Sequence, residues 1–206
     1  MLARLRDIPE RNELTPAPLE LLLFAGLLPL WLVAGWADWL CHRVQRIEHS
    51  SGLPETLMHG AMLLSMAVAV SAALLLEIDA AVLLLAAACC IVHEAVVWCD
   101  LVYADRCRRI PPAEQWVHAI QIAAPWVGLV GLGWVHADQV RALWDGSGTA
   151  DWSWRAKADP VPLRWLAATG VAALLLVLLP FADEWRRAWR AQLRRAASAS
   201  PSAKAA

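Results

Sequence analysis

The sequence predicts an all-α integral membrane protein, a helical bundle with about five transmembrane helices. The first indication is composition, because 59% of the 206 residues are hydrophobic and only 18% are charged, against about half and about 25% in typical soluble domains. The second is distribution, since the apolar residues lie in runs long enough to cross a bilayer, which takes ~20 residues per helix. The third is the aromatic set, with 13 Trp against 2 Phe and 1 Tyr, because Trp concentrates at membrane interfaces.

The apolar runs divide the chain into one membrane domain with polar ends. The predicted spans, whose boundaries hold to ~2–4 residues, are 18–41, 55–76, 80–104, 113–135 and 161–181. The connection at 77–79 is so short that the second and third helices should be antiparallel neighbours. The predicted regions are a polar N-terminal segment (1–16), the transmembrane bundle (17–185) with an extramembrane loop (136–160), and a basic, then disordered, tail (186–206).

Arginines predict the orientation of the bundle. One side of the membrane carries the basic tail and five loop arginines: Arg43, Arg46, Arg106, Arg108 and Arg109. By the positive-inside rule this side is cytoplasmic, with the N-terminus outside and the C-terminus inside a bacterial-type inner membrane. The same five arginines are candidates for contacts with lipid headgroup phosphates. The formal net charge of −1, without a basic domain, gives no sign of nucleic-acid binding.

Ionisable residues within the spans form carboxylate–histidine sets. Three pairs are spaced i,i+4, which places both members on one helix face; they are Asp38 with His42, Glu55 with His59, and Glu114 with His118. Further candidates are His93, Glu94 and Asp100 in the third span and Glu48 and His49 in the first loop. Because successive helices alternate in direction, the pairs and Asp100 should meet at one side of the bilayer, the predicted cytoplasmic side.

A metal site explains this gathering of polar residues. A charged side chain at the bilayer centre costs about 2.5–3.5 kcal/mol on insertion scales, so such residues are functional candidates. The predicted ligands are His42, His49, His59, His93, His118, Asp38, Glu55, Glu94, Asp100 and Glu114, with Glu48, Tyr103 and Gln121 as residues that could hold ligands in place. One zinc needs only three or four protein ligands, so the supply indicates two metals. The alternative for Glu55 or Glu114 alone is a favourable position near a positive helix N-terminus.

Mixed histidine and carboxylate ligands, without a thiolate set, suit iron, manganese or zinc. Four helices that contribute them inward also match the logic of di-iron carboxylate bundles. Iron, two ions per chain, is therefore the predicted cofactor, and zinc is the alternative.

In architecture, residues 31–121 resemble the membrane-bound, histidine-rich di-iron enzymes, which include fatty-acid hydroxylases, desaturases and alkane hydroxylases. The residues that carry this resemblance are the DxxxH motif (Asp38, His42), the two ExxxH motifs (Glu55, His59 and Glu114, His118) and HExxxxxD (His93, Glu94, Asp100). The HxxxH and HxxHH boxes of that group are absent. The resemblance implies an oxidoreductase that acts on a lipid or another hydrophobic substrate, with iron activating dioxygen and a cytoplasmic electron donor.

Three other functions fit parts of the pattern. A zinc-dependent membrane hydrolase would use a zinc-activated water with a glutamate as general base. A haem or electron-carrier protein would need two histidines facing each other across the bundle, and the many carboxylates count against it. A metal or proton transporter would relay ions along paired groups, but no polar path continues beyond the cluster in the sequence.

Overall fold

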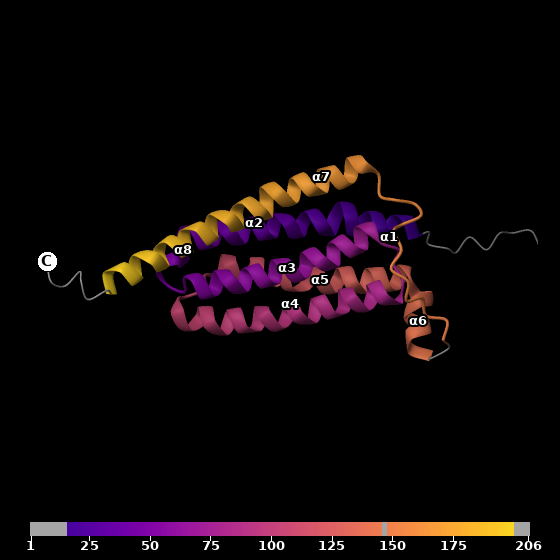
Figure 1. Cartoon of the computed structure of the whole chain (residues 1–206), viewed down its shortest axis with the longest axis horizontal. Helices are drawn as coiled ribbons and strands as arrows, with labels where there is room; N and C mark the ends of the chain where they lie inside the picture. Colours follow the sequence, from indigo (N-terminus) through magenta and orange to yellow (C-terminus); the bar gives the residue numbers. More distant parts are fainter. Residues whose placement is uncertain (1–15, 146–147, 200–206) are drawn as a thin grey trace, which may run out of the picture.

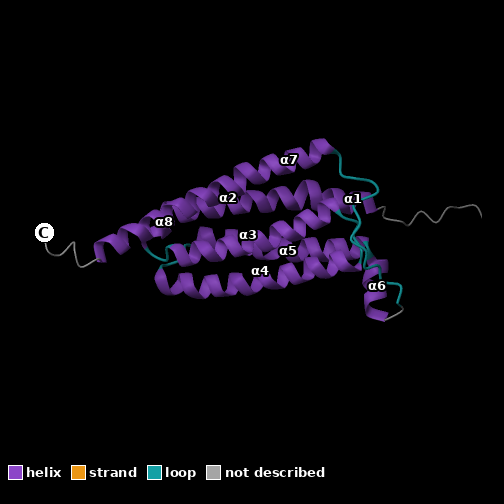
Figure 2. Cartoon of the chain, viewed as in Figure 1, coloured by secondary structure: helices purple, strands orange, loops and turns teal. Residues whose placement is uncertain are grey.

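The structure, a computed structural model, describes residues 16–145 and 148–199, and these residues form helices and loops without a strand (Figure 2). Five of the helices are long and apolar enough to cross a membrane: Leu19–Gln45, Leu53–Leu75, Ala80–Cys107, Pro112–Val135 and Leu163–Ala199. The prediction of an all-α, multi-pass membrane bundle is confirmed.

The spans follow one another along the chain with short connections at the end where the predicted ligands lie. The first span is α1 (Pro16–Leu22), a π-helical segment (Leu23–Leu27) and α2 (Leu28–Gln45); α3 (Leu53–Leu75), α4 (Ala80–Cys107) and α5 (Pro112–Val135) are the next three; the last is α7 (Leu163–Ala173), a second π-helical segment (Leu174–Leu178) and α8 (Leu179–Ala199). The helices run side by side, with α7 and α8 forming one long rod along the bundle (Figure 1). The first described helix begins at one end of the bundle and the last one finishes at the other end, as an odd number of spans requires.

The helices α3 and α4 are antiparallel neighbours, as the short turn predicts. Asp79 caps α4, because its Oδ1 accepts a hydrogen bond of 2.9 Å from the backbone N–H of Val82. Farther along the pair, Ala69, Ala86 and Cys89 are buried in the interface. Small side chains let membrane helices approach closely, where the gain comes from van der Waals contact. The interface between α3 and α4 therefore forms a closely packed side of the bundle.

The predicted extramembrane loop 136–160 contains a helix of its own, α6 (Ala137–Asp145), which lies across the end of the bundle (Figure 1). Beyond it, the chain returns to the α3–α4 turn. The backbone N–H of Glu77 donates to the Arg155 carbonyl at 2.9 Å, and that of Lys157 donates to the Leu75 carbonyl at 3.1 Å. The loop therefore closes the end of the bundle that lies opposite the predicted ligands.

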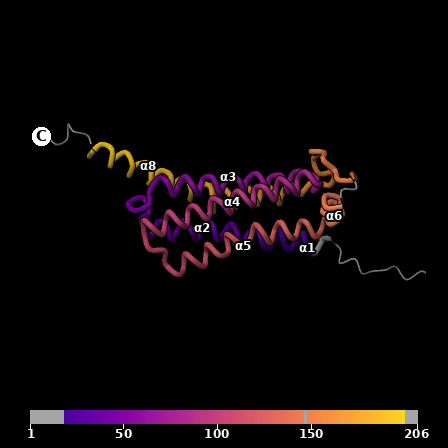
Figure 3. Tube along the Cα trace, turned by 90° about the horizontal axis from the view of Figure 1, so that it is seen from below, coloured from indigo at the N-terminus to yellow at the C-terminus, as the bar shows by residue number. Residues whose placement is uncertain are grey.

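The basic tail is more ordered than the sequence analysis predicts. The last span continues as a helix to Ala199, and residues 200–206 lie outside the described part of the chain. Ala, Arg, Leu and Gln, which dominate the segment, are strong helix formers. At ~1.5 Å per residue, the 37 residues of the whole last span, Leu163–Ala199, extend over ~55 Å, which is longer than the ~30 Å thickness of the hydrocarbon layer. The arginine-rich end of α8 therefore extends beyond the layer, and Figure 3 shows it projecting past the other helices.

Replacing the cap tests the α3–α4 turn. Asp79→Ala should lower the free energy of unfolding by about 1 kcal/mol, because the first turn of α4 loses its side-chain acceptor. The measurement is unfolding of the purified protein in mixed micelles. Asp105→Ala, at the exposed last turn of the same helix, is the control and should cost nothing; an equal loss in both variants would contradict the capping role.

Candidate metal centre

The predicted i,i+4 pairs meet at one end of the bundle. The end of α2, the start of α3, the end of α4 and the start of α5 bring together His42, His59, Asp100 and His118, all of which line one cavity. The connection between α2 and α3 is tight: Arg46 takes a left-handed conformation (φ 55°) and Gly52 has φ 66°. This turn lets His42 and His59 lie opposite each other although they come from antiparallel helices.

Two imidazole rings form the middle of the site. The rings of His42 and His59 are stacked, with centroids 4.7 Å apart and an interplanar angle of 6°. The ring of His118 lies 6.4 Å from that of His42 at an angle of 61°. His42 is 1% exposed, so this side chain is removed from water and depends on its protein neighbours.

Glu184 of α8 orients both stacked rings. Its Oε2 lies 3.1 Å from Nδ1 of His42 and its Oε1 lies 2.7 Å from Nδ1 of His59. A carboxylate only accepts hydrogen bonds, so in this arrangement both Nδ1 atoms carry the proton. In the neutral form of each imidazole, the lone pair is then on Nε2, on the side away from Glu184.

Nε2 of His42 faces the first group of potential ligands, which we call the Asp38 group (Asp38, His42, Glu114, His118). It lies 3.4 Å from Asp38 Oδ1 and 3.3 Å from Glu114 Oε1. Nε2 of His118 lies 3.1 Å from the same Asp38 oxygen. One ligand atom from each of the four residues falls within 4.8 Å of the others, as convergence on one ion requires.

Nε2 of His59 faces the second group, which we call the Asp100 group (Glu55, His59, Asp100). It lies 3.6 Å from Asp100 Oδ2, and Asp100 is 4% exposed. His42, His59 and Glu184 also satisfy the same distance test. That third combination would use Glu184 as a ligand instead of as the acceptor that orients the two rings.

Several buried polar atoms in these groups lack a hydrogen-bond partner within the described part of the chain. They are Asp38 Oδ1, His42 Nε2 and Asp100 Oδ1. Leaving such an atom unsatisfied costs about 1–3 kcal/mol. The first two belong to the Asp38 group, where they approach each other without hydrogen-bond geometry. A cation that they share would satisfy both, so these residues fit a metal.

Arg108 forms the outer wall of the site. The guanidinium contacts Glu55 Oε1 at 2.5 Å and Glu114 Oε1 at 2.6 Å, and it donates to Gln45 Oε1 at 2.9 Å. Gln45 in turn donates to Glu114. Although burial alone would lower the pKa of Arg108, hydrogen bonds to Glu114 and Glu55 raise that pKa above its usual value, so the guanidinium stays charged.

The prediction that Arg108 contacts lipid headgroups is therefore wrong, because its side chain is only 6% exposed and its donors are directed inward. Of the other arginines in that prediction, Arg106 and Arg109 are exposed. Arg43 binds Asp183 at 2.6 Å, and Arg46 donates to His49 Nε2. Because Arg106, Arg108 and Arg109 lie close together in the sequence, the sequence does not indicate that Arg108 is the buried one.

Three predicted ligands lie outside the two groups. His49 is exposed and bonded to Arg46, Glu94 accepts a hydrogen bond from Trp126 Nε1 at 3.1 Å, and His93 lies deeper along the cavity. The three supporting candidates also differ in role. Glu48 binds Arg187, Tyr103 donates to the Ser51 carbonyl, and Gln121 lines the cavity.

Glu184 is the residue that sequence reasoning missed. It follows the last apolar run directly and stands beside arginines, so it resembles the start of a solvated tail. The available signal was spacing, because Pro180, Glu184, Ala188 and Ala191 recur every three or four residues and all are buried. Salt bridges from Arg187 to Glu48 (2.5 Å) and from Arg43 to Asp183 hold α8 against the bundle, which brings Glu184 to the histidines.

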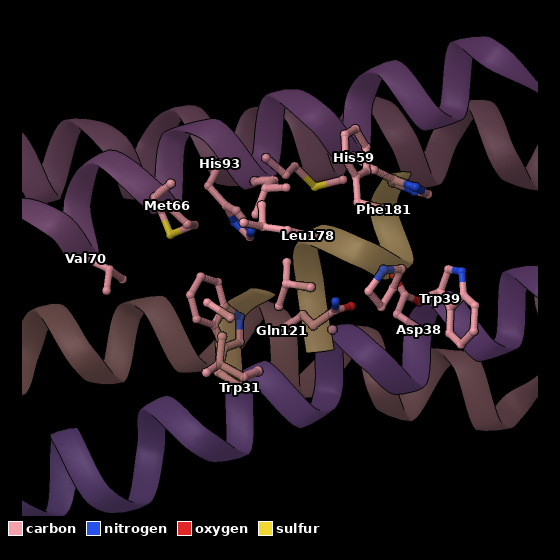
Figure 4. A pocket seen from close by; sticks show the side chains of 18 of the residues that line it. Trp31, Asp38, Trp39, His59, Met66, Val70, His93, Gln121, Leu178 and Phe181 are labelled. Carbon is pink, nitrogen blue, oxygen red and sulfur yellow. The ribbon is translucent and has the colours of Figure 1, made fainter. Parts of the chain in front are cut away.

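The site opens into a cavity of about 400 Å³ that runs along the bundle. Asp38, His59 and Glu184 line its polar end. The rest is walled mainly by apolar side chains from all five spans, among them Trp31, Met66, Val70, Val97, Ile122, Leu166, Val177, Leu178 and Phe181. Figure 4 shows several of them. The arrangement can hold a cation at one end of a space suited to a hydrocarbon chain.

Comparison of the chain with protein-family models, curated proteins and solved structures found no match.

Removing Arg108 tests its part in the site. Arg108→Ala leaves Glu55 and Glu114, both 0% exposed, without their cation, and breaking a buried pair in this way costs about 3–5 kcal/mol. We expect a large fall in thermal stability, measured by intrinsic tryptophan fluorescence in detergent. Arg109→Ala changes an exposed neighbour and should leave the melting temperature unaltered; similar losses in the two variants would argue against the buried pairing.

Proposed function

We propose that this membrane protein is a metalloenzyme, a two-iron oxidoreductase that acts on a lipid or another hydrophobic substrate. The observation that carries the proposal is the placement of two imidazole–carboxylate groups at the polar end of an apolar cavity. A metal bound there would face whatever lies in the cavity. A purely structural metal would need no such access.

The charge balance supports two ions. The carboxylates of Asp38, Glu55, Asp100, Glu114 and Glu184 are all buried or nearly so. Arg108 pairs with two of them, Glu55 and Glu114. With neutral histidines, four negative charges remain, which two divalent cations would balance. Each neutral imidazole lends one lone pair, so His42 would serve one ion and His59 the other.

The donor set favours iron. Within the described residues no thiolate lies in either ligand group, and carboxylates with imidazoles suit iron, manganese or zinc. The arrangement of carboxylates and histidines from several helices around one site also matches the design of di-iron bundles. Iron, when bound, would supply the redox chemistry that activates dioxygen. One zinc in place of two irons would instead indicate a hydrolase.

The chain itself would bind and align the substrate. The apolar walls would hold an alkyl chain and exclude water, while the polar end would fix the position of the bond that reacts. In a hydroxylation, one oxygen atom enters a C–H bond and the other leaves as water, and a donor provides two electrons and two protons. We place this end at the cytoplasm, where the exposed arginines lie and where a reduced donor protein is accessible.

The geometry disfavours two other functions. A haem ligated by two histidines needs them apart on opposite sides of the porphyrin, whereas the rings of His42 and His59 are stacked at 4.7 Å. An ion transporter needs a polar path beyond the site, whereas the cavity continues between mainly apolar side chains.

Elemental analysis of the purified protein tests the metal content. We expect about two irons per chain, as the ligand groups and the charge balance require, without a Soret band in the absorption spectrum. Asp38→Asn combined with His42→Ala should remove the iron of the Asp38 group and leave about one iron per chain. His49→Ala and His136→Ala, outside the two groups, are the controls and should retain it. Stoichiometric zinc, or no metal in a folded protein, would refute the di-iron proposal.

Replacement of Glu184 by glutamine tests its orienting role. The glutamine NH2 group replaces one of the two carboxylate oxygens, so only one of the two Nδ1–H groups keeps a hydrogen-bond acceptor in place. Loss of a residue that orients metal-bound histidines typically weakens metal affinity about 10–100-fold. The affinity can be measured by competition with a chelator, with Asp105→Asn, at an exposed position of α4, as the control. Unchanged affinity in Glu184→Gln would show that the rings are oriented without it.

A further inference from the structure

A group of polar side chains interrupts the apolar part of the cavity. Trp31 of α2, His93 of α4 and Gln121 of α5 all line it, and Figure 4 shows the three reaching into it from different helices. We call them the polar trio. None belongs to either ligand group, and the proposed metal chemistry leaves them without a function.

None of the three side chains has a hydrogen-bond partner in the part of the chain that the structure describes. His93 is 5% exposed, whereas Trp31 and Gln121 are half-buried, and all three line the cavity. A polar group that faces an apolar space without a partner is costly in a membrane interior. Such a group that faces a cavity is expected to bind a ligand, because nothing else nearby satisfies it.

The trio lies at an intermediate depth along the cavity. His93 precedes Asp100 by seven residues on α4, as Trp31 precedes Asp38 on α2, and at ~1.5 Å per residue each step is ~10 Å. Gln121 is one turn beyond His118. Farther still, Met66 and Val70 of α3 continue the cavity as an apolar wall (Figure 4). The order along the cavity is therefore the ligand groups, the polar trio and an apolar end.

The chemistry of the trio restricts what it can bind. The indole N–H of Trp31 only donates, whereas the amide of Gln121 and the neutral imidazole of His93 each both donate and accept. The three together offer four N–H donors and two acceptors, so they favour a ligand oxygen that accepts hydrogen bonds. The cavity lining contains no Lys or Arg, so an anionic carboxylate or phosphate would lack a counter-charge at this depth. A neutral carbonyl, ester or hydroxyl oxygen fits.

We infer that the polar trio binds a neutral oxygen of the substrate, so the substrate is an oxygen-bearing lipid and not a plain hydrocarbon. This inference rests on the proposed function in taking the cavity as the binding site of a hydrophobic substrate. The oxygen is held ~5–10 Å from the ligand groups, and an alkyl segment occupies the apolar end beside Met66 and Val70. The trio thereby sets which part of the chain reaches the polar end.

A matched pair of ligands tests the inference without any turnover. Methyl dodecanoate and dodecane share the alkyl chain and differ in the ester oxygens. The full-length protein in phosphatidylcholine nanodiscs is loaded with radiolabelled methyl dodecanoate, and displacement by unlabelled ester or by dodecane gives both affinities. We expect the ester to bind about tenfold more tightly, the effect of one to two hydrogen bonds.

The variants His93→Phe and Gln121→Met remove hydrogen-bonding groups while keeping size. Each should reduce the preference for the ester to about twofold or less, with dodecane affinity unchanged. His49→Phe and Gln115→Met make the same replacements at exposed positions and should keep the full preference. Equal affinities of the wild-type protein for the two ligands would overturn the inference, even if neither variant folds, and so would a full preference in both variants.

Metal content measured on the same preparations separates this inference from the proposed function. Ester preference in a protein without metal would support the trio and refute the di-iron proposal. Two irons in a protein that does not distinguish the ligands would do the opposite.

Discussion

The site depends on the pairing of buried charge. Five carboxylates lie at one end of a bundle whose surroundings are apolar, and an isolated carboxylate in such a medium is far less stable than in water. Arg108 compensates part of the charge through Glu55 and Glu114, and Glu184 accepts from two imidazoles. The remaining partners, Asp38 and Asp100, each keep a buried oxygen without a hydrogen bond. That incomplete pairing is the reason why we propose a bound cation at this end of the bundle.

Glu184 links this electrostatic constraint to the architecture. Its position depends on α8. The salt bridge from Arg187 to Glu48 holds α8 to the α2–α3 connection, and the salt bridge from Arg43 to Asp183 holds α8 to α2. By fixing which nitrogen of His42 and His59 carries the proton, it directs the Nε2 lone pairs toward two different sets of carboxylates. The fifth span is thus part of the site, although the sequence analysis assigned the site to the first four spans.

The cavity gives a hydrophobic ligand an apolar route to the polar residues of the site. Close packing of α3 on α4 through Ala69, Ala86 and Cys89 forms one side of the bundle. On the other side, Leu166 of α7, Val177 of the π-helical segment Leu174–Leu178 and Phe181 of α8 cover the cavity. A ligand that enters here exchanges lipid for protein contacts. Selectivity must then come from the few polar groups along the walls, which is why the polar trio matters to the choice of substrate.

The sequence by itself determined the fold class, the five spans, and the end of the bundle at which His42, His59, Asp100 and His118 meet, because hydropathy and helical spacing are local properties. It could not distinguish His49 or Glu94 from these residues, because the local sequence does not show which side chains become buried in the tertiary structure. Tertiary structure alone decided that Arg108 is directed inward and that Glu184 reaches the histidines. The contact of Arg108 with Glu55 and those of Glu184 with His42 and His59 join residues more than fifty positions apart. Local sequence patterns do not reveal such contacts, because they form only when distant segments pack together.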